Sequence, residues 1–152
     1  MKAVYVTALL ALTALSTTIV CGQGGGRFRK MIETRRAEQQ QSPAGTREID
    51  VNGVKRTYIL HLPPSYRKDE RLPLVIALHG GGGNAENMVN MSGFSDKADK
   101  ENFAVVYPNG SGRMGNALLT FNAVGCCAYA MRNKVDDVAF ISKLIDKLAA
   151  DY

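Results

Sequence analysis

The fold is decided by the stretch LPLVIALHGGGGN, which occupies residues 72–84. Its apolar part, Leu74–Leu78, shows no polar alternation, which predicts a strand buried on both faces at the centre of an α/β sheet. Pro73 fits only the first position of such a strand, because proline cannot donate to the ladder. Four glycines then allow a sharp turn and leave several backbone N–H groups uncovered. Asn84 is a good N-cap for a helix over residues 85–91.

A strand, a His-Gly-Gly-Gly-Gly turn and a helix form the arrangement from which serine hydrolases build half of an oxyanion hole. We expect Gly81 and Gly82 to supply the N–H donors, and His79, Gly80 and Gly83 to shape the loop. Fixed donors stabilise the charge that develops on a carbonyl oxygen during acyl transfer, and losing one costs roughly 3–4 kcal/mol. His79 precedes the glycines at the strand end, so we do not expect it to be the catalytic base.

Two other interpretations of the glycines stay open. Gly80, Gly82 and Ala85 match the spacing of a dinucleotide-binding loop. That fold needs an acidic residue at the end of the next strand, whereas residues 103–107 are followed by Pro108-Asn109. A tight turn with a purely structural role is the other alternative.

The first 46 residues predict a leader and a linker. Residues 1–22 have the pattern of a secretory signal peptide, cleaved after Gly22 or Ser16. Lipidation at Cys21 and an uncleaved membrane anchor are the alternatives. Residues 23–46 are rich in Gly, Arg, Gln and Glu, which predicts a disordered linker.

The net charge of +5 comes mainly from these first residues, which hold six of the 19 Lys and Arg but only two of the 14 Asp and Glu. The part expected to be globular, residues 47–152, is therefore nearly neutral. It shows no excess of basic residues of the kind that indicates nucleic-acid binding.

The rest of the chain predicts alternating strands and helices. Asn52-Gly53 is a strong hairpin-turn signal within residues 47–62. Ser95 is expected to cap a helix over residues 96–101, and residues 103–107 predict a second buried strand, so the order is that of a βαβ unit.

A long loop over residues 108–134 precedes the last expected helix, residues 136–150. Asp136 or Asp137 is expected to cap this helix. A metal or acid–base role for the paired acids is the less common alternative. The apolar face is predicted to comprise Val138, Ile141, Leu144, Ile145 and Leu148.

Cys126 and Cys127 are adjacent, and neighbouring Cα atoms are about 3.8 Å apart, which is shorter than the usual span of a disulfide. We therefore expect no bridge between these two residues. Unpaired thiols are unusual in exported proteins, so both are disulfide candidates whose partner cysteine would lie outside this chain.

Over residues 47–152 the sequence resembles the secreted polyhydroxybutyrate-depolymerase-like esterases, a group that includes feruloyl and acetylxylan esterases. The resemblance rests on five segments: residues 58–66, 72–88, 105–113 and 135–141, and the loop around the two cysteines. It implies the first half of an α/β-hydrolase sheet: an N-terminal hairpin, strand 3 with the oxyanion loop, helix A, strand 4 and helix B. It also implies a secreted or periplasmic serine esterase without cofactor or metal, acting on polymer or plant cell-wall esters.

In this family the next element carries the Gly-x-Ser-x-Gly nucleophile, and the acid and the histidine follow later. No serine of this sequence has that spacing, so we expect the whole catalytic triad beyond Tyr152 and a chain that is inactive alone. The family often has Trp before the cysteines, whereas this chain has no Trp and Phe121 takes that place. The rival interpretations are a non-catalytic extracellular binding module and, less favoured, a dinucleotide-binding oxidoreductase.

Overall fold

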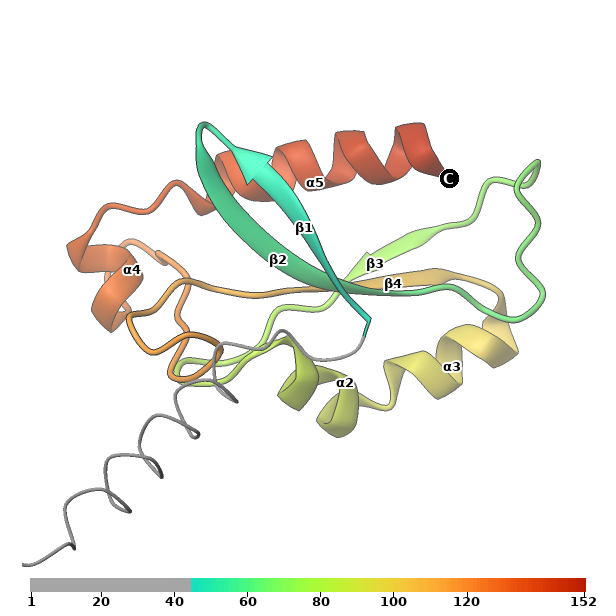
Figure 1. Ribbon diagram of the computed structural model, residues 1–152. Coiled ribbons are helices and arrows are strands. Elements are labelled where there is room, and N and C mark those ends of the chain that lie inside the picture. The colour runs from blue at the N-terminus through green and yellow to red at the C-terminus, as the bar shows by residue number, and fades with distance from the viewer. Residues whose placement is uncertain (1–44) are drawn as a thin grey trace, which may run out of the picture.

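The computed structural model describes residues 45–152, which form a mixed α/β sheet with helices on both faces (Figure 1). The predicted signal peptide, residues 1–22, and all but the last two residues of the predicted linker lie outside the described residues. The sheet has four strands in the order β1-β2-β4-β3. No helix among residues 45–152 is long and apolar enough to cross a membrane.

The hairpin forms as predicted. Strands β1 (Thr46–Val51) and β2 (Val54–His61) pair antiparallel. Their turn, Asn52-Gly53, has φ values of 55° and 82°, as a tight hairpin turn requires. Side chains of β2 alternate between the two faces of the sheet, so that Arg56 and Tyr58 are buried on the same face.

The βαβ unit is also present. Strands β3 (Leu74–Ile76) and β4 (Ala104–Pro108) pair parallel, and every residue of β4 is buried. The prediction that residues 74–78 are buried on both faces is wrong for β3, whose three residues are only half-buried. Among the described residues β3 pairs with β4 alone and forms the edge of the sheet, and Leu78 is 48 % exposed.

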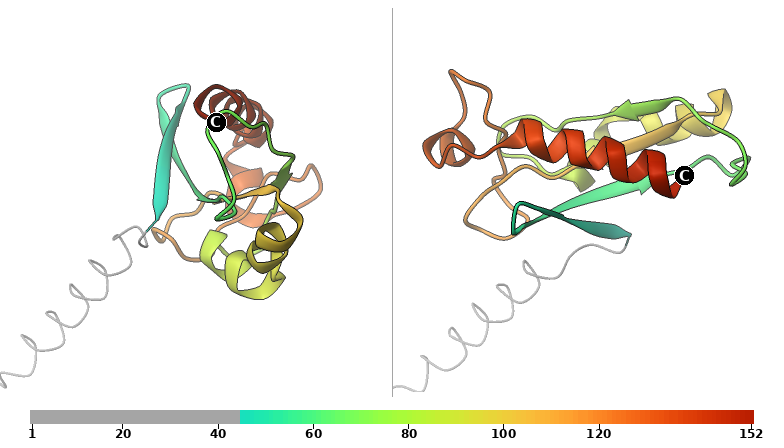
Figure 2. Two further views of the ribbon diagram at one scale, coloured as in Figure 1. Left: turned by 90° about the vertical axis from the view of Figure 1, so that its right-hand side faces the viewer. Right: turned by 90° about the horizontal axis from the view of Figure 1, so that it is seen from above.

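Two helices cover one face of the sheet, α2 (Ala85–Ser92) and α3 (Phe94–Glu101), as Figure 2 shows. Asn84 caps α2 as predicted, because its side chain accepts a hydrogen bond from the N–H of Asn87. The predicted cap at Ser95 is wrong. Helix α3 begins at Phe94, two residues before the predicted start, and the Ser95 hydroxyl lies 2.8 Å from the hydroxyl of Tyr107.

Helix α5 (Asp137–Asp151) packs on the opposite face (Figure 2). Asp136 is its N-cap, accepting from the N–H of Ala139 at 2.9 Å, as predicted. Its buried face differs from the prediction. Phe140 lies in the core with Leu144 and Leu148, while Val138 is 83 % exposed.

The segment before α5 contains a short helix, α4 (Ala128–Arg132), inside the predicted loop. Just before it, the side chains of Cys126 and Cys127 lie against each other. The expectation that each pairs with a cysteine outside this chain stays a prediction.

Candidate functional site

The glycine loop, residues 80–83, connects β3 to α2 and is held by the segment that follows β4. The N–H of Gly82 donates to the carbonyl of Leu119 at 2.9 Å, and the N–H of Leu119 donates to the carbonyl of Gly83 at 3.3 Å. Within the loop, the N–H of Gly83 donates to the carbonyl of Gly80 at 3.0 Å. These bonds define the backbone shape of the loop before any ligand arrives.

The two predicted oxyanion donors are not equivalent in this loop. The N–H of Gly82 is occupied by Leu119, whereas the N–H of Gly81 has no hydrogen-bond partner among residues 45–152. Gly80 and Gly81 are exposed, and a Cβ atom at either would meet nothing within 4 Å. Gly82 has a φ of +84°, a conformation that glycine adopts without strain. Gly81 is therefore the one of the pair whose donor is unoccupied among the described residues.

His79 lies at the start of this loop and is 6 % exposed. Its Nδ1 lies 2.8 Å from the carbonyl of Gly80, and its Nε2 accepts from the N–H of Gly110 at 3.0 Å. The ring also packs on Phe121, with centroids 4.8 Å apart. Burial lowers the pKa of His79. A neutral ring with a proton on Nδ1 satisfies both contacts, so the imidazole is fully engaged in holding backbone.

Asn109 follows β4 directly and lies at the other flank of the loop. It is 4 % exposed. Its Oδ1 accepts from the N–H of Ala85 at 2.7 Å, and its Nδ2 donates to the hydroxyl of Thr57 at 2.9 Å. One buried amide thus connects the start of α2 to β2.

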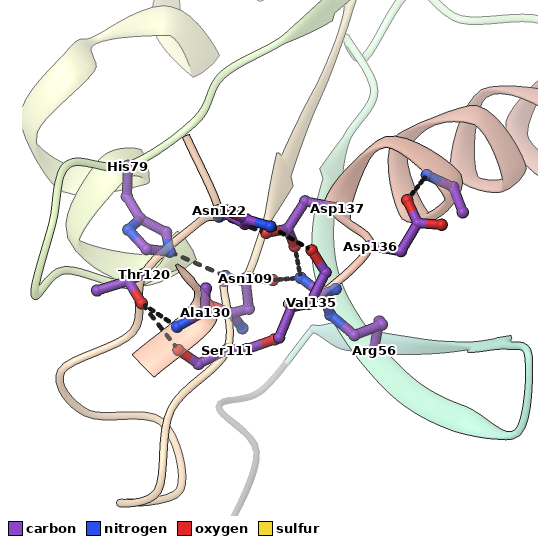
Figure 3. Close-up of polar contacts among 12 residues, drawn as sticks. Arg56, His79, Asn109, Ser111, Thr120, Asn122, Ala130, Val135, Asp136 and Asp137 are labelled. Carbon is purple, nitrogen blue, oxygen red and sulfur yellow. Dashed lines mark hydrogen bonds and ion pairs between the residues drawn. The ribbon is translucent and has the colours of Figure 1, made fainter. Parts of the chain in front are cut away.

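A buried ion pair contacts the backbone of Asn109 (Figure 3). The guanidinium of Arg56 donates to Asp137 at 2.7 Å and to the carbonyl of Asn109 at 3.1 Å. It also lies 4.0 Å from the centroid of the Phe140 ring, in a favourable cation–π position. The other oxygen of Asp137 accepts from the N–H of Asn122 at 2.6 Å. Both charges are therefore paired and hydrogen-bonded, as buried charges must be.

The same network anchors the loop after β4. Thr120 accepts from the N–H of Ala130 at 3.1 Å, and its backbone pairs with that of Ser111. Gly110 packs so tightly here that a Cβ atom would lie 2.5 Å from the carbonyl oxygen of Thr120. The loop predicted over residues 108–134 is thus ordered by short bridges and buried side chains.

Sequence reasoning missed the roles of Arg56, Asn109, Thr120 and Asn122 in holding the site, and considered Asp137 only as a helix cap or as one of a pair of acids. One signal was available: Arg56 lies two residues before Tyr58, on the face of β2 that turns to the core. Nothing local in the sequence indicates the roles of the other three. A cavity of about 670 Å³ lies beside Arg56 and Asn109, but Gly80–Gly83 do not line it.

A protein family and a curated relative each match part of this chain. Residues 56–121 match the family described as Esterase PHB depolymerase. The candidate esterase NocK of Nocardia uniformis subsp. tsuyamanensis is 42% identical over 65 residues, which are 42% of this chain and 19% of that protein. The chain therefore spans about a fifth of the length of this relative.

The solved structures that match include a complex of a pOPH variant with DMSO and native pOPH. The first has 15% sequence identity and a TM-score of 0.35, covering 45% of this chain and 21% of that chain. The second has 16% identity and a TM-score of 0.36, covering 52% and 29%. These likenesses are too weak to support an argument. From the sequence matches, over residues 56–121, this chain is similar to the N-terminal portion of PHB-depolymerase-like esterases.

Proposed function

We propose that this chain supplies the oxyanion-loop part of a serine esterase that hydrolyses carboxylic esters through an acyl-enzyme. The observation that carries the proposal is the N–H of Gly81, which is exposed and has no partner among the described residues. The backbone around it is held by His79, Leu119 and Asn109. A fixed donor of this kind stabilises a developing oxyanion without reorganising during the reaction.

The proposal places the nucleophile, the acid and the base in a segment that follows Tyr152. It treats the β1-β2-β4-β3 sheet as the first half of an α/β-hydrolase sheet, with the nucleophile strand beside β3. The unpaired edge of β3 and the half-buried state of its three residues support this placement. The substrates proposed are polyhydroxyalkanoate, feruloyl or acetyl-polysaccharide esters, which an exported enzyme would hydrolyse outside the cytoplasm.

The test compares two substitutions in a protein that contains this chain and the segment after it. Gly81→Pro removes the donor and should lower kcat by roughly 10²–10³-fold, with a far smaller effect on KM. Gly81→Ala keeps the N–H and meets no neighbour within 4 Å, so its loss should be much smaller.

Hydrolysis of p-nitrophenyl acetate, with and without a serine-directed phosphonate, is the measurement. The 152-residue chain alone should show no turnover. An equal kcat in well-folded Gly81→Pro would contradict the oxyanion role, and phosphonate-sensitive turnover by the short chain would contradict the placement of the nucleophile.

A further inference from the structure

We infer that Asn109 is a positioning residue, which fixes the glycine loop so that the N–H of Gly81 keeps its direction. The catalytic part of this inference rests on the proposed function, whereas the structural part stands on the contacts alone. The side chain of Asn109 receives the N–H of Ala85 at 2.7 Å. Ala85 is the first residue of α2, so this bond ties down the point at which the glycine loop becomes helix.

The contact with Ala85 cannot be replaced by the helix cap. Asn84 caps α2 by accepting from Asn87, which leaves the N–H of Ala85 without a partner inside the helix. Because Ala85 is 1 % exposed, water does not reach this N–H readily. A buried donor that loses its acceptor is costly. The helix start is therefore expected to move if Asn109 loses its side-chain oxygen.

The residue after Asn109 holds the other flank of the loop. The N–H of Gly110 donates to Nε2 of His79 at 3.0 Å. Asn109 and Gly110, the two residues just after β4, thus form hydrogen bonds with the chain on both sides of residues 80–83. A shift of this end of β4 would move both flanks together.

Three further hydrogen bonds hold Asn109 itself in place. Its backbone N–H donates to the carbonyl of Thr57 at 2.9 Å, and its Nδ2 donates to the Thr57 hydroxyl at 2.9 Å. Its carbonyl accepts from Arg56, which is paired with Asp137. The position of the Asn109 oxygen is therefore set by β2 and α5, elements outside the glycine loop. Side chains held in this way can fix the position of the site residues that they contact.

The first experiment measures amide hydrogen exchange in the 152-residue chain, and needs no activity. Asn109→Ala should speed exchange at Ala85, Gly82 and Gly83, whose N–H groups are hydrogen-bonded, by roughly tenfold or more, since one buried hydrogen bond is lost, and should leave α5 protected. Asn109→Asp should restore protection, because a carboxylate still accepts from Ala85 and the Thr57 hydroxyl can turn to donate to it. Unchanged exchange in Asn109→Ala, or uniformly fast exchange in the parent chain, would overturn the inference.

The second experiment measures kinetics in the longer protein used above. Asn109→Ala should lower kcat by up to about 10²-fold, the loss that a 1 Å misplacement can cause, with KM within a few-fold. Asn109→Asp should recover most of this loss. Asn90→Ala, an exposed asparagine of α2, and Leu148→Ala, a buried core residue of α5, should both retain kcat, the second with a lower melting temperature.

These outcomes separate two failures. If the parent enzyme lacks phosphonate-sensitive turnover, the proposed function fails while the exchange experiment still decides whether Asn109 holds the loop. If the parent is active but Asn109→Ala keeps its kcat, or loses it only to the extent that Leu148→Ala does, Asn109 contributes stability alone and the positioning role is wrong.

Discussion

The two ends of β2 are joined to neighbouring helices by ion pairs of very different kinds. Near its start, Arg56 pairs with Asp137 of α5, and the two side chains are 5 % and 10 % exposed. At its end, His61 pairs with Asp99 of α3, and these side chains are 29 % and 38 % exposed. The buried pair lies at the end of the sheet that carries Asn109 and the glycine loop, because β2 runs antiparallel to β4. Buried polar contacts are thus concentrated where the candidate site needs a fixed backbone.

The largest effect is expected when one partner of the buried pair is removed. Asp137→Ala leaves Arg56 charged and without its carboxylate in the core, and removes the acceptor of the Asn122 N–H, which should cost about 3–5 kcal/mol of unfolding free energy. Asp99→Ala breaks the half-exposed pair at the other end and should cost about 0–1 kcal/mol. Urea denaturation of both variants measures the difference. Equal losses would show that the two ends of β2 are held alike.

A second comparison contrasts two glycines of the site. Gly110→Ala would place a Cβ atom 2.5 Å from backbone atoms of Thr120, and relieving that overlap should cost about 1–3 kcal/mol. Gly80→Ala meets nothing within 4 Å, so its free energy of unfolding should change by less than about 1 kcal/mol. The midpoints of urea denaturation test this. A large loss in Gly80→Ala would mean that the exposed side of the loop is packed in solution.

Helix capping gives a smaller effect near the same loop. Asn84→Ala removes the side chain that accepts from the N–H of Asn87 and donates to the carbonyl of Asn116, and the loss of the cap should cost about 1 kcal/mol. Asn90→Ala, on the exposed side of the same helix, removes no hydrogen bond that the structure shows and serves as the matched control. If both variants melt alike, the cap contributes little beside the bond from Ala85 to Asn109.

The structural features that could be predicted from the sequence are local ones. Asn52-Gly53 predicts the hairpin because two consecutive residues with positive φ are needed there. Asn84 and Asp136 predict helix starts because a side-chain oxygen reaches an N–H only three residues away. Each of these features depends on a few consecutive residues, so no knowledge of the tertiary fold is required.

The parts that escaped prediction depend on distant partners. Arg56 and Asp137 are 81 residues apart, and nothing near either residue indicates the other. The buried face of α5 was misplaced because Val138 and Phe140 both fit an apolar periodicity. In the folded chain Phe140 packs with Tyr58 and lies against Arg56, both from β2, and these contacts bury it. The role of Asn109 likewise requires Ala85 and Thr57 to converge from separate elements.

The smallest effect expected is a loss of unfolding free energy at low pH, because it involves the titration of His79 alone. Burial lowers the pKa of His79 in the folded chain, below the value of about 6.5 expected when unfolded. The unfolded state therefore binds the proton more readily, so the stabilising effect is present above about pH 6.5 and is lost as the pH falls below it. Protonation would also remove the acceptor at Nε2 that holds the N–H of Gly110.

The measurement is the free energy of unfolding at pH 8 and pH 5.5, in the parent chain and in His79→Gln. All other ionisable groups are the same in both proteins, so their contribution cancels in the comparison. The parent should lose more stability toward pH 5.5 than the variant does. Equal losses would mean that folding does not lower the pKa of His79, and the contrast between the buried and the half-exposed contacts of the sheet would then not extend to this histidine.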